Sequence, residues 1–458
     1  MAKKIKTDFD VIIVGAGPSG MFAAYELKKN RPDLEILLLD RGRRRAINDT
    51  RNNLFGFGGA GTFSDGKLTL TSKTGGQLVE RGYLTEKEFE KYLRYVESLY
   101  EKFGGEQEIK IGNEKKITEL IRRANAAGLE LIPFPVKHWG REEAFQLVEK
   151  LYRHLDEKGV AIKLNSKVLS VEKNSNKWGV ILKNQKKFWS NCLILAPGRA
   201  GAEWTVSQLE KYGVKTENNP ADVGIRMEVK KSMTSELTDS LYDFKIKYTT
   251  QERRDMVRTF CVCPGGKVIK EQHEDFTLVN GQTDKDNQTE NTNFAILVSI
   301  SFTEPFKNAN AYGRYAAKIA TLLSNGSVLV QTLADWQNRR RSKPESLKNF
   351  PVKPTLSEAV PGDLRGLGLH ERIFAALNEM IEAMGKFIPG INIGNNALLY
   401  GLEAKFYSKR VVYNGNGFET RAERLYVIGD GSGITRGLAQ STIMGIKAAQ
   451  DLIKKYYH

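Results

Sequence analysis

The chain opens with a short apolar run, followed by glycines and then by a stretch with helical periodicity. Residues 11–14 are all apolar and lead into the glycine-rich segment 15–20. Apolar side chains recur at helical spacing over 21–29, and a second apolar run, 36–39, ends in Asp40. Unbroken apolar runs of this length are typical of strands buried on both faces. The pattern therefore predicts a strand, a tight turn, a helix and a second strand.

The same order returns near the other end of the chain. Residues 425–428 form an apolar run, which is followed by the glycine-rich segment 429–437 and by a helical pattern over 438–454. Periodic and alternating segments predict further elements between the two ends. We expect helices at 86–103 and 142–158, and strands at 160–164, 167–172, 178–182, 187–189, 192–195, 222–229, 258–262 and 294–302. The polar stretch 280–293 is expected to be an exposed loop.

The glycines of the N-terminal turn have separate physical roles. Gly15 permits the tight turn, Gly17 leaves the backbone open to a pyrophosphate, and Gly20 lets the helix pack close to the sheet. The free N–H groups at the helix N-terminus attract phosphate. Asp40 follows at the spacing of a carboxylate that accepts hydrogen bonds from a ribose hydroxyl. We interpret this segment as a dinucleotide-binding site.

The C-terminal turn differs because it contains an acidic residue, Asp430. Together with the N-terminal turn, it resembles the FAD-dependent oxidoreductases of the glutathione-reductase type. The resemblance implies that the N-terminal turn binds ADP, that Asp430 hydrogen-bonds the ribityl chain, and that backbone groups around 433–435 approach the flavin pyrimidine edge. The segment Ala196-Pro197-Gly198 resembles an Ala-Thr-Gly turn of the same superfamily, with Pro197 in the threonine position.

A narrower resemblance covers almost the whole chain. The blocks 58–68, 258–266, 291–295, 399–408 and 429–438 are similar to those of the family described as uncharacterised NAD(FAD)-utilising, or FAD-dependent, dehydrogenases. After Gly198, this chain has Arg199-Ala200 in place of the His-Ser of many relatives. The family implies FAD and redox chemistry, and it implies that 58–67 is a loop over the cofactor, the alternative being a plain surface turn. There, Lys67 would stabilise reduced flavin, and Ser64 or Asp65 would hold the ribityl chain.

These arguments give a set of expected cofactor-binding residues. They are Gly15, Gly17, Pro18, Ser19, Gly20, Asp40, Arg41, Gly59, Gly61, Thr62, Ser64, Lys67, Val168, Ala196, Gly198, Gly429, Asp430, Gly433, Ile434 and Thr435. The expected fold is α/β: a Rossmann-like FAD-binding domain with a parallel sheet and helices, and an inserted, mainly β (α+β) substrate or cap domain. We expect the FAD-binding domain at 1–218, with a helical insertion at 79–130, and its return at 352–458. The inserted domain is expected at 219–351.

Three polar residues are the candidates for catalysis: Tyr400, Lys405 and Arg436. Tyr400 or Lys405 would donate a proton to the substrate, and the planar guanidinium of Arg436 would pair with flavin O2 or a substrate carboxylate. The alternative is that Tyr400 packs between the domains and that Lys405 is a solvated lysine without a catalytic role. Cys261 and Cys263 share one face of an expected strand. They are interpreted as a redox pair or, in preference, as two small buried side chains. We expect no metal site.

Two absences narrow the chemistry. No second GxGxxG segment stands between an apolar strand pattern and a helical pattern, so NAD(P)H is expected at most as a transient electron donor. In addition, 56–66 contains no CxxxxC pair. The sequence therefore indicates an oxidoreductase that transfers a hydride between N5 of noncovalent FAD and an unidentified small organic substrate. An electron-donor protein is a further candidate partner.

The net charge of +16 is the one unusual bulk property. It leaves open the alternative of a flavoprotein that modifies tRNA, although basic residues spread along the chain are typical of a solvated surface. A peripheral membrane reductase ranks below both, because no helical segment has a broad apolar face rich in tryptophan. Three cysteines and no apolar run of about eighteen residues favour a cytoplasmic protein without a transmembrane segment.

Overall fold

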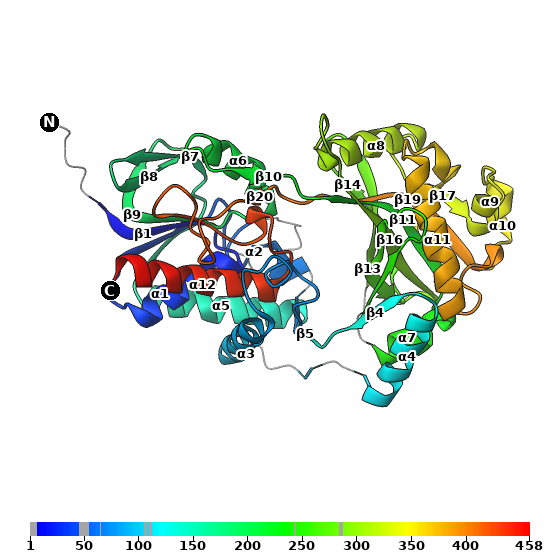
Figure 1. The fold of residues 1–458 in the computed structure, drawn as a ribbon, viewed down its shortest axis with the longest axis horizontal. Helices are drawn as coiled ribbons and strands as arrows, with labels where there is room; N and C mark the ends of the chain where they lie inside the picture. Colours follow the sequence, from blue (N-terminus) through cyan, green and yellow to red (C-terminus); the bar gives the residue numbers. More distant parts are fainter. Residues whose placement is uncertain are drawn as a thin grey trace. The chain divides into compact units, whose positions relative to one another are not determined.

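The computed structural model describes residues 7–44, 55–64, 66–104, 108–109, 112–241, 244–283 and 287–458, and the side chains of Ser64 and Arg141 lie outside this description. The chain forms two compact units (Figure 1). Unit 1 consists of 1–110, 135–219 and 408–458. Unit 2 consists of 111–134 and 220–407. Within the described part of the chain, no helix has the length and hydropathy needed to cross a membrane.

Unit 1 is built on a parallel sheet that is extended by an antiparallel hairpin. The parallel strands are, in spatial order, β6 (Val160–Lys163), β2 (Ile36–Leu39), β1 (Phe9–Val14), β9 (Lys187–Leu195) and β21 (Leu425–Val427). The antiparallel strands β8 (Lys177–Leu182) and β7 (Val168–Asn174) continue from the first half of β9. The central strands are apolar because helices and loops cover both of their faces, so that Ile12 and Ile13 are both fully buried.

Helices from distant parts of the sequence pack on this sheet. They are α1 (Pro18–Asn30), α3 (Glu86–Lys102), α5 (Arg141–Glu157) and α12 (Leu438–Tyr456), with the smaller α6 (Ala202–Glu210). Figure 1 shows α1 and α12 running side by side. Their approach needs a glycine, because a Cβ on Gly445 of α12 would overlap the backbone of Ser19 in α1. The two glycine-rich turns of the sequence are therefore joined through their helices.

Unit 2 is built on a single eight-stranded sheet. Its strands are, in spatial order, β18 (Val360–Pro361), β17 (Leu329–Thr332), β19 (Ala397–Lys405), β11 (Ala221–Lys230), β16 (Asn291–Ile300), β13 (Met256–Pro264), β12 (Phe244–Thr249) and β4 (Glu130–Pro133). Every pairing is antiparallel except that of β17 with β18. The helices α4 (Glu114–Ala126), α7 (Lys231–Ser240), α8 (Ala309–Leu323) and α11 (Glu371–Phe387) complete its main core.

The two faces of this sheet differ in chemistry. On β11, Val223, Ile225 and Met227 belong to the apolar core that α11 completes. The alternate positions, which point to the opposite face, hold Arg226 and Glu228. The hairpin of β14 (Lys267–Gln272) and β15 (Thr277–Gln282) lies on this second face, where a Cβ on Gly281 would overlap the guanidinium of Arg226. Unit 2 thus contains a row of buried polar side chains under a hairpin.

The structure confirms the expected α/β fold class, with a parallel-sheet domain and a mainly β second domain. The expected domain boundaries need correction. We expected 352–407 to return to the first domain, but β19 pairs between β17 and β11 and so belongs to unit 2. The segment 111–134 also lies in unit 2, because β4 pairs with β12, whereas α3 remains in unit 1.

Two local expectations were also wrong. Residues 59–64 form the short helix α2 (Gly59–Ser64) rather than a loop. The stretch 280–293 is not a loop throughout, because β15 extends to Gln282 and β16 begins at Asn291 with buried polar residues. A run of asparagine and threonine suggested exposure, but Asn291 donates to Glu228 and Asn293 accepts from Arg226 within the sheet of unit 2.

Candidate functional site

The turn after β1 contains three glycines. Two of them have no room for a side chain, and the third does. A Cβ on Gly15 would overlap the carbonyl oxygen of Ala196, and a Cβ on Gly20 would overlap the carbonyl oxygen of Gly15. Gly17 differs, because a Cβ there would meet nothing closer than the Cα of Gly59 at 3.9 Å. Gly17 is the N-cap of α1 with φ −80°, and Pro18 occupies the first turn. The backbone at this helix N-terminus is therefore less crowded than at Gly15 and Gly20, at the place where the sequence predicted a phosphate.

Asp40 anchors the backbone around the N-terminal turn. Its Oδ2 accepts the backbone N–H of Ala16 at 2.9 Å, and its Oδ1 accepts those of Gly42 at 2.7 Å and Gly56 at 2.9 Å. The residue is 8% exposed. Since a carboxylate offers about four acceptor positions, three of them are occupied by the backbone. Asp40 thus fixes the turn, and little of its carboxylate is left for a ribose hydroxyl.

The neighbouring candidates Arg41 and Val168 lie beside this anchor. The guanidinium of Arg41 is exposed and stacks over the ring of Phe55 at 4.0 Å. Val168 is buried at the start of β7, and the N–H of Ser166, two residues earlier, donates to the carbonyl of Asp40 at 2.7 Å. The end of β2 is thus bonded to the segment that enters β7.

The ends of β9 and β21 meet beside the turn of β1. Ala196 donates its N–H to Val14 at 2.7 Å, and Ile428 donates to Leu195 at 2.8 Å. Gly198 has φ +64° and would have nothing within 4 Å of a Cβ, whereas a Cβ on Gly431 would lie 2.9 Å from the carbonyl oxygen of Gly198. The strand order changes direction between β1 and β9, and ligands of open parallel sheets bind outside the carboxyl ends of strands at such a point.

The N-terminal and C-terminal turns are in direct contact. A Cβ on Gly429, which has φ +72°, would overlap the hydroxyl of Ser19. Gly433, with φ +78°, is similarly close to the backbone of Ser408 and Lys409. Both positions need glycine because of the left-handed backbone and because of the close neighbour. The structure therefore brings two predicted motifs from opposite ends of the chain into one place.

Asp430 carries the carboxylate of this junction. Its Oδ1 accepts hydrogen bonds from the hydroxyls of Thr435 at 3.0 Å and Ser441 at 2.8 Å. Its Oδ2 lies 3.9 Å from Nε of Arg199 and accepts no hydrogen bond from the described residues. Burial raises the pKa of Asp430 above its ordinary value, although Arg199 and the two hydroxyls oppose this. One oxygen is thus held in place, and the other is available to a hydroxyl of a ligand.

The segment 72–78 lies along the start of α12. Gln440 donates to the carbonyls of Ser72 and Thr74 and accepts from the N–H of Leu78. The N–H of Arg436 donates to the carbonyl of Gly75 at 2.9 Å, and Ile434, which is fully buried, accepts from Gln77 at 3.0 Å. These bonds fix the backbone around the expected site residues Ile434, Thr435 and Arg436. No pattern in the sequence had indicated that 72–78 contributes to this site.

The helix α2 supplies another wall of the junction. A Cβ on Gly59 would lie 3.0 Å from Gly17, and one on Gly61 would lie 3.3 Å from Leu438 at the start of α12. The hydroxyl of Thr62 is turned inward and donates to the carbonyl of Gly58 at 2.8 Å. Lys67 follows in β3 (Lys67–Thr69), which pairs with β5 (Val136–His138). The side chain of Ser64 and all of Asp65 lie outside the described residues.

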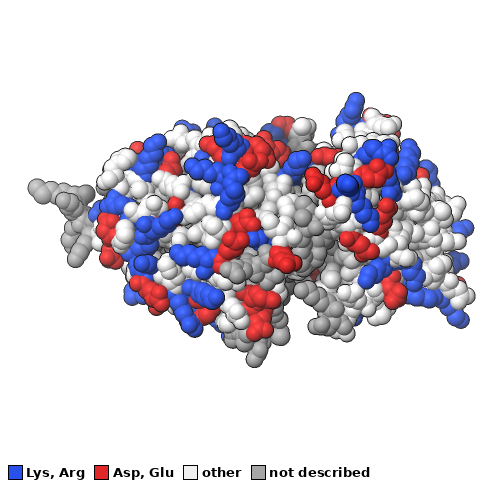
Figure 2. Space-filling view, turned by 90° about the horizontal axis from the view of Figure 1, so that it is seen from below, with Lys and Arg blue, Asp and Glu red and all other residues white. Residues whose placement is uncertain are grey.

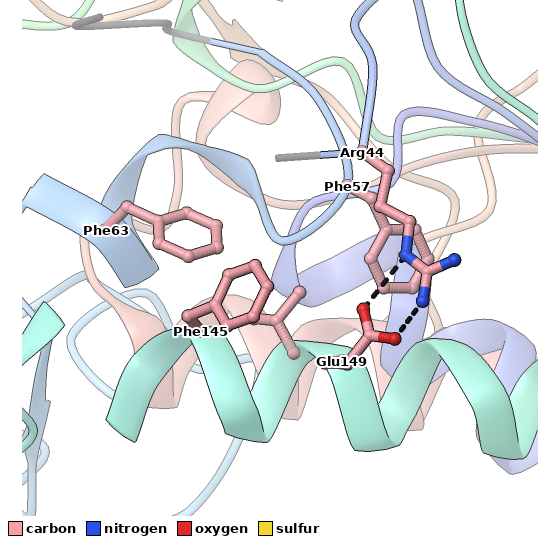
Figure 3. Close-up of a pocket in the computed structure, with 6 residues that line it drawn as sticks. Arg44, Phe57, Phe63, Phe145 and Glu149 are labelled. Atoms are coloured by element: carbon pink, nitrogen blue, oxygen red, sulfur yellow. Dashed lines mark hydrogen bonds and ion pairs between the residues drawn. The ribbon is translucent and has the colours of Figure 1, made fainter. Parts of the chain in front are cut away.

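A pocket opens between α2 and α5 (Figure 3). In Figure 3, the rings of Phe63 and Phe145 point into it, and the guanidinium of Arg44 pairs with the carboxylate of Glu149 at its other end. Phe57 and Val148 complete the lining. The pocket is mostly apolar with one ion pair, and it lies next to the segment that faces Gly17. Sequence reasoning did not single out any of these residues.

In unit 2, Tyr400 does not occupy the position of a proton donor to substrate. Its side chain is fully buried in an apolar cluster with Val330 and Phe350. Its hydroxyl donates to Oε2 of Glu228 at 2.5 Å, and Glu228 also accepts from the hydroxyl of Thr355 at 2.6 Å. Burial and the charge of Glu228 both raise the pKa of Tyr400. In this structure the hydroxyl of Tyr400 is engaged with Glu228, which favours the structural alternative, and a catalytic role for Tyr400 stays a prediction.

Lys405 belongs to a network of charges that the sequence did not predict. Its Nζ lies 3.1 Å from Oε1 of Glu403 and 5.6 Å from the ring centre of Phe260, and its side chain is 17% exposed. Glu403 pairs with Arg226 through two bonds, of 2.7 and 2.9 Å, and neither of these side chains is exposed. Burial opposes ionisation of Glu403, but Arg226 and Lys405 overcome this and lower its pKa.

A second ion pair lies on the same strand. Arg258 donates to Oδ2 of Asp222 and, at 2.8 Å, to the hydroxyl of Tyr407. That hydroxyl donates to Asp222 at 2.5 Å, as does the hydroxyl of Ser299. Burial disfavours ionisation of Asp222, yet Arg258 and the two hydroxyls lower its pKa. Alternation along β11 was the available signal, because the charged residues Asp222, Arg226 and Glu228 lie at even positions and alternate with the apolar residues at odd positions.

Two family models match parts of the chain. Residues 10–221 match the family model described as FAD dependent oxidoreductase. Residues 213–406 match the family described as FAD-dependent protein, C-terminal domain-like. The boundary between the two matches coincides with the change from unit 1 to unit 2 near residue 220. FAD is therefore the cofactor named by the families on both sides of the boundary.

Individual relatives give less detail. An uncharacterized protein of Clostridium beijerinckii is 26% identical over 97% of this chain and 81% of its own length. A thiamine thiazole synthase of Thermotoga maritima is 35% identical over 26% of this chain and 37% of its own. Among solved structures, glycine oxidase from Geobacillus kaustophilus is 12% identical, covers 98% of this chain and 95% of that one, and has a TM-score of 0.41.

The residues of unit 1 fit FAD. Gly198 has open space beside it and Gly17 has room for a side chain, in contrast to the closed positions Gly15 and Gly20. The N–H groups at the start of α1 suit a pyrophosphate. The available oxygen of Asp430 suits a ribityl hydroxyl, because its partner oxygen is already held by Thr435 and Ser441. Such a site needs both turns together, and the structure supplies both.

The basic composition does not form one patch on the face drawn in Figure 2. Lys and Arg side chains are interspersed there with Asp and Glu. Among the described residues, several basic side chains pair with acidic ones, as in Arg123–Glu236 and Arg372–Asp255. A nucleic acid is typically held by a continuous basic stripe. This face therefore offers no support for the RNA alternative.

Proposed function

We propose that this protein is an oxidoreductase that transfers a hydride between noncovalently bound FAD and a small organic molecule. The junction of Ser19 with Gly429 carries the proposal, because it unites a phosphate-binding helix terminus with the carboxylate of Asp430. This is the arrangement expected of the glutathione-reductase type. The direction of transfer is left open, so both a dehydrogenase and a reductase fit.

The residues of unit 1 would hold and orient the cofactor. N–H groups at the start of α1 would bind the pyrophosphate beside Gly17, and Asp430 would accept a hydrogen bond from the ribityl chain. Arg436, whose backbone is fixed by Gly75, would supply positive charge near the ring. FAD, when bound, supplies the two-electron chemistry. The protein's part is to bind it without a covalent link and to fix its position.

The residues of unit 2 would supply the polar contacts to substrate. Lys405 is the better placed of the two candidates in unit 2, since its side chain is 17% exposed whereas Tyr400 is fully buried, and its Nζ lies near Glu403 and the ring of Phe260. We propose that it binds an anionic or polar group of the substrate or delivers a proton to it. A substrate with a carboxylate suits this cation best.

NAD(P)H or an electron-donor protein would act as a visiting reductant. The glycine-rich turn that fits a dinucleotide, at 15–20, is the one assigned to FAD. We therefore propose that the donor does not stay bound through the cycle.

Purification of the protein and analysis of its bound flavin tests the proposal. We expect a yellow protein that releases FAD on denaturation, in a ratio near one per chain, and that is bleached anaerobically by NADH, NADPH or a reduced ferredoxin. Screening of carboxylate-bearing substrates for reoxidation would then identify the second substrate. A colourless protein that takes up no FAD on reconstitution would overturn the proposal.

A further inference from the structure

Two thiols approach each other closely in β13. The Sγ atoms of Cys261 and Cys263 lie 3.7 Å apart. Neither cysteine is in a disulfide. In a regular strand, residues two apart have Cα atoms about 6.6 Å apart, near the upper end of the range that a disulfide spans. A local irregularity of the strand is therefore needed to bring such thiols together.

The strand has that irregularity at these residues. The register of β13 with β16 shifts between Phe260 and Cys263. Cys261 has φ +50°, a left-handed backbone that is uncommon for a residue other than glycine. Such outliers persist where surrounding bonds hold them, and they concentrate at functional positions. Here the carbonyl of Cys261 accepts from Nη1 of the buried Arg226 at 3.3 Å, which fixes the bulge from the other side.

The two thiols differ in access. Cys261 is exposed, and Cys263 is buried. The pKa of Cys263 is raised, first because its S–H donates toward Cys261 and second because burial disfavours its thiolate. An exposed attacking thiol beside a buried second thiol is the arrangement of a dithiol that reacts in two steps. The third cysteine, Cys192, is buried alone in β9 of unit 1.

We propose that Cys261 and Cys263 form a redox-active dithiol that undergoes thiol–disulfide exchange with small-molecule disulfides. The thiolate of Cys261 attacks one sulfur of a disulfide RSSR, so that a mixed disulfide forms and one RS⁻ leaves. Cys263 then loses its proton and attacks Sγ of Cys261, which forms the internal disulfide and releases the second RS⁻. The cysteine pair loses two electrons and two protons, and RSSR is reduced to two RSH.

The exchange has a structural consequence for unit 2. The carbonyl of Cys261 and the side chain of Asn293 both accept from Nη1 of Arg226, at 3.3 and 2.8 Å. Arg226 in turn pairs with Glu403, the partner of Lys405. Closing the disulfide alters the bulge to which this network is bonded. The redox state of the two thiols is thus linked, through Arg226 and Glu403, to the polar surroundings of Lys405.

Oxidation of the full-length native protein by oxidised glutathione tests the proposal. After rapid alkylation and digestion, trypsin cleavage at Arg258 and Lys267 places both cysteines in one peptide. We expect that peptide to become two hydrogens lighter and to resist alkylation, and to recover on addition of dithiothreitol, while Cys192 stays reduced. If both thiols remain alkylatable while the protein is native, or if the disulfide forms only after denaturation, the proposal is wrong.

Single variants assign the order of attack. In Cys263→Ser, glutathione should remain attached to Cys261, because no second thiol is present to release it. In Cys261→Ser, the remaining Cys263 should react as slowly as Cys192, the internal control. A mixed disulfide that also persists in the wild-type protein, or fast reaction of Cys263 in Cys261→Ser, would contradict the proposed sequence. The flavin content and circular dichroism spectrum of each variant report whether it is folded.

Discussion

The hydroxyl of Ser19 lies against Gly429 so closely that Gly429 has no space for a Cβ. This contact joins the first turn of α1 to the end of β21, so two motifs at opposite ends of the chain share one site. Each motif alone is compatible with several nucleotides. Their contact, together with the carboxylate of Asp430, favours a cofactor with both a pyrophosphate and a polyhydroxyl chain.

The glycines of the N-terminal turn separate folding from cofactor binding. Gly17→Ala should leave stability almost unchanged, because φ at Gly17 is −80° and the nearest atom would lie 3.9 Å away. It should weaken FAD binding about tenfold or more, equivalent to about 1.4 kcal/mol, because the methyl group occupies the space for the pyrophosphate. Gly15→Ala is the matched control and should cost stability, since Gly15 has φ +112° and no free volume. Thermal unfolding with and without FAD distinguishes the two effects, and equal destabilisation by both variants would contradict them.

Asp430→Asn should stabilise the protein without cofactor and weaken FAD binding. The pKa of Asp430 in the folded protein is raised above 3.8, so folding favours the protonated form. The folded state therefore binds more protons than the unfolded state, and stability falls as pH rises from about 3.8 through the folded pKa. Asparagine does not ionise, so the variant keeps this stability at neutral pH. Its amide oxygen can still accept hydrogen bonds from the hydroxyls of Thr435 and Ser441.

Denaturant unfolding of the cofactor-free proteins between pH 4 and pH 7 measures this difference. FAD affinity should fall roughly 10- to 100-fold, as for loss of a hydrogen bond to a charged group of about 1.5–3 kcal/mol. An Asp430→Asn protein that binds FAD as tightly as the wild type would exclude the proposed ribityl contact.

Tyr400→Phe should lower stability rather than catalysis. The change removes the donor that Glu228 accepts at 2.5 Å and leaves the hydrogen bonds from Thr355 and Asn291. A cost of about 1.5–3 kcal/mol is expected for a buried bond to a charged acceptor. Urea unfolding measures it, with FAD content as the control for unit 1. Unchanged stability with loss of flavin turnover would restore Tyr400 as a catalytic residue.

Loss of one partner of the buried Arg226–Glu403 pair should destabilise the protein more than loss of both partners. Arg226→Met leaves the buried Glu403 with Lys405 but without its bidentate partner, and Glu403→Leu leaves Arg226 buried without its carboxylate. Loss of a buried partner costs about 3–5 kcal/mol, and the double variant should recover much of it. The pKa of Glu403 is lowered from 4.5, so its contribution is present above that value and is lost as pH falls through the folded pKa. The free energies of unfolding of the wild type, the two single variants and the double variant give one double-mutant cycle at pH 7 and another at pH 4. Additive losses at pH 7 would show that the two charges are not coupled.

Sequence reasoning predicted the local elements well where the pattern was strong and self-contained. The β1–α1–β2 unit and the β21–α12 unit lie where periodicity and glycines placed them, because each buries an apolar strand and starts a helix on its own. The role of Asp40 was not predictable in this way. Its partners Gly42 and Gly56 come from a turn and a separate segment whose approach the sequence does not reveal.

The surroundings of the polar residues of unit 2 were not predictable for a related reason. Tyr400 stands in a polar-looking block, but its burial depends on β17 and the segment around Phe350, which come from elsewhere in the chain. The pairing of β19 with β11 also decided that 397–405 belongs to unit 2. Long-range strand pairing sets both outcomes, and single-sequence periodicity does not encode it.

Titration of the flavin-free protein with FAD and, separately, with NAD⁺ tests the central claim most directly. Isothermal titration calorimetry on the wild type and on Gly17→Ala reports affinity and stoichiometry without an assay for the unknown substrate. The account predicts one FAD per chain, much weaker binding of NAD⁺, and a clear loss of FAD affinity in the folded Gly17→Ala variant. Binding of NAD⁺ in preference to FAD, or FAD binding that is unaffected by Gly17→Ala, would contradict it.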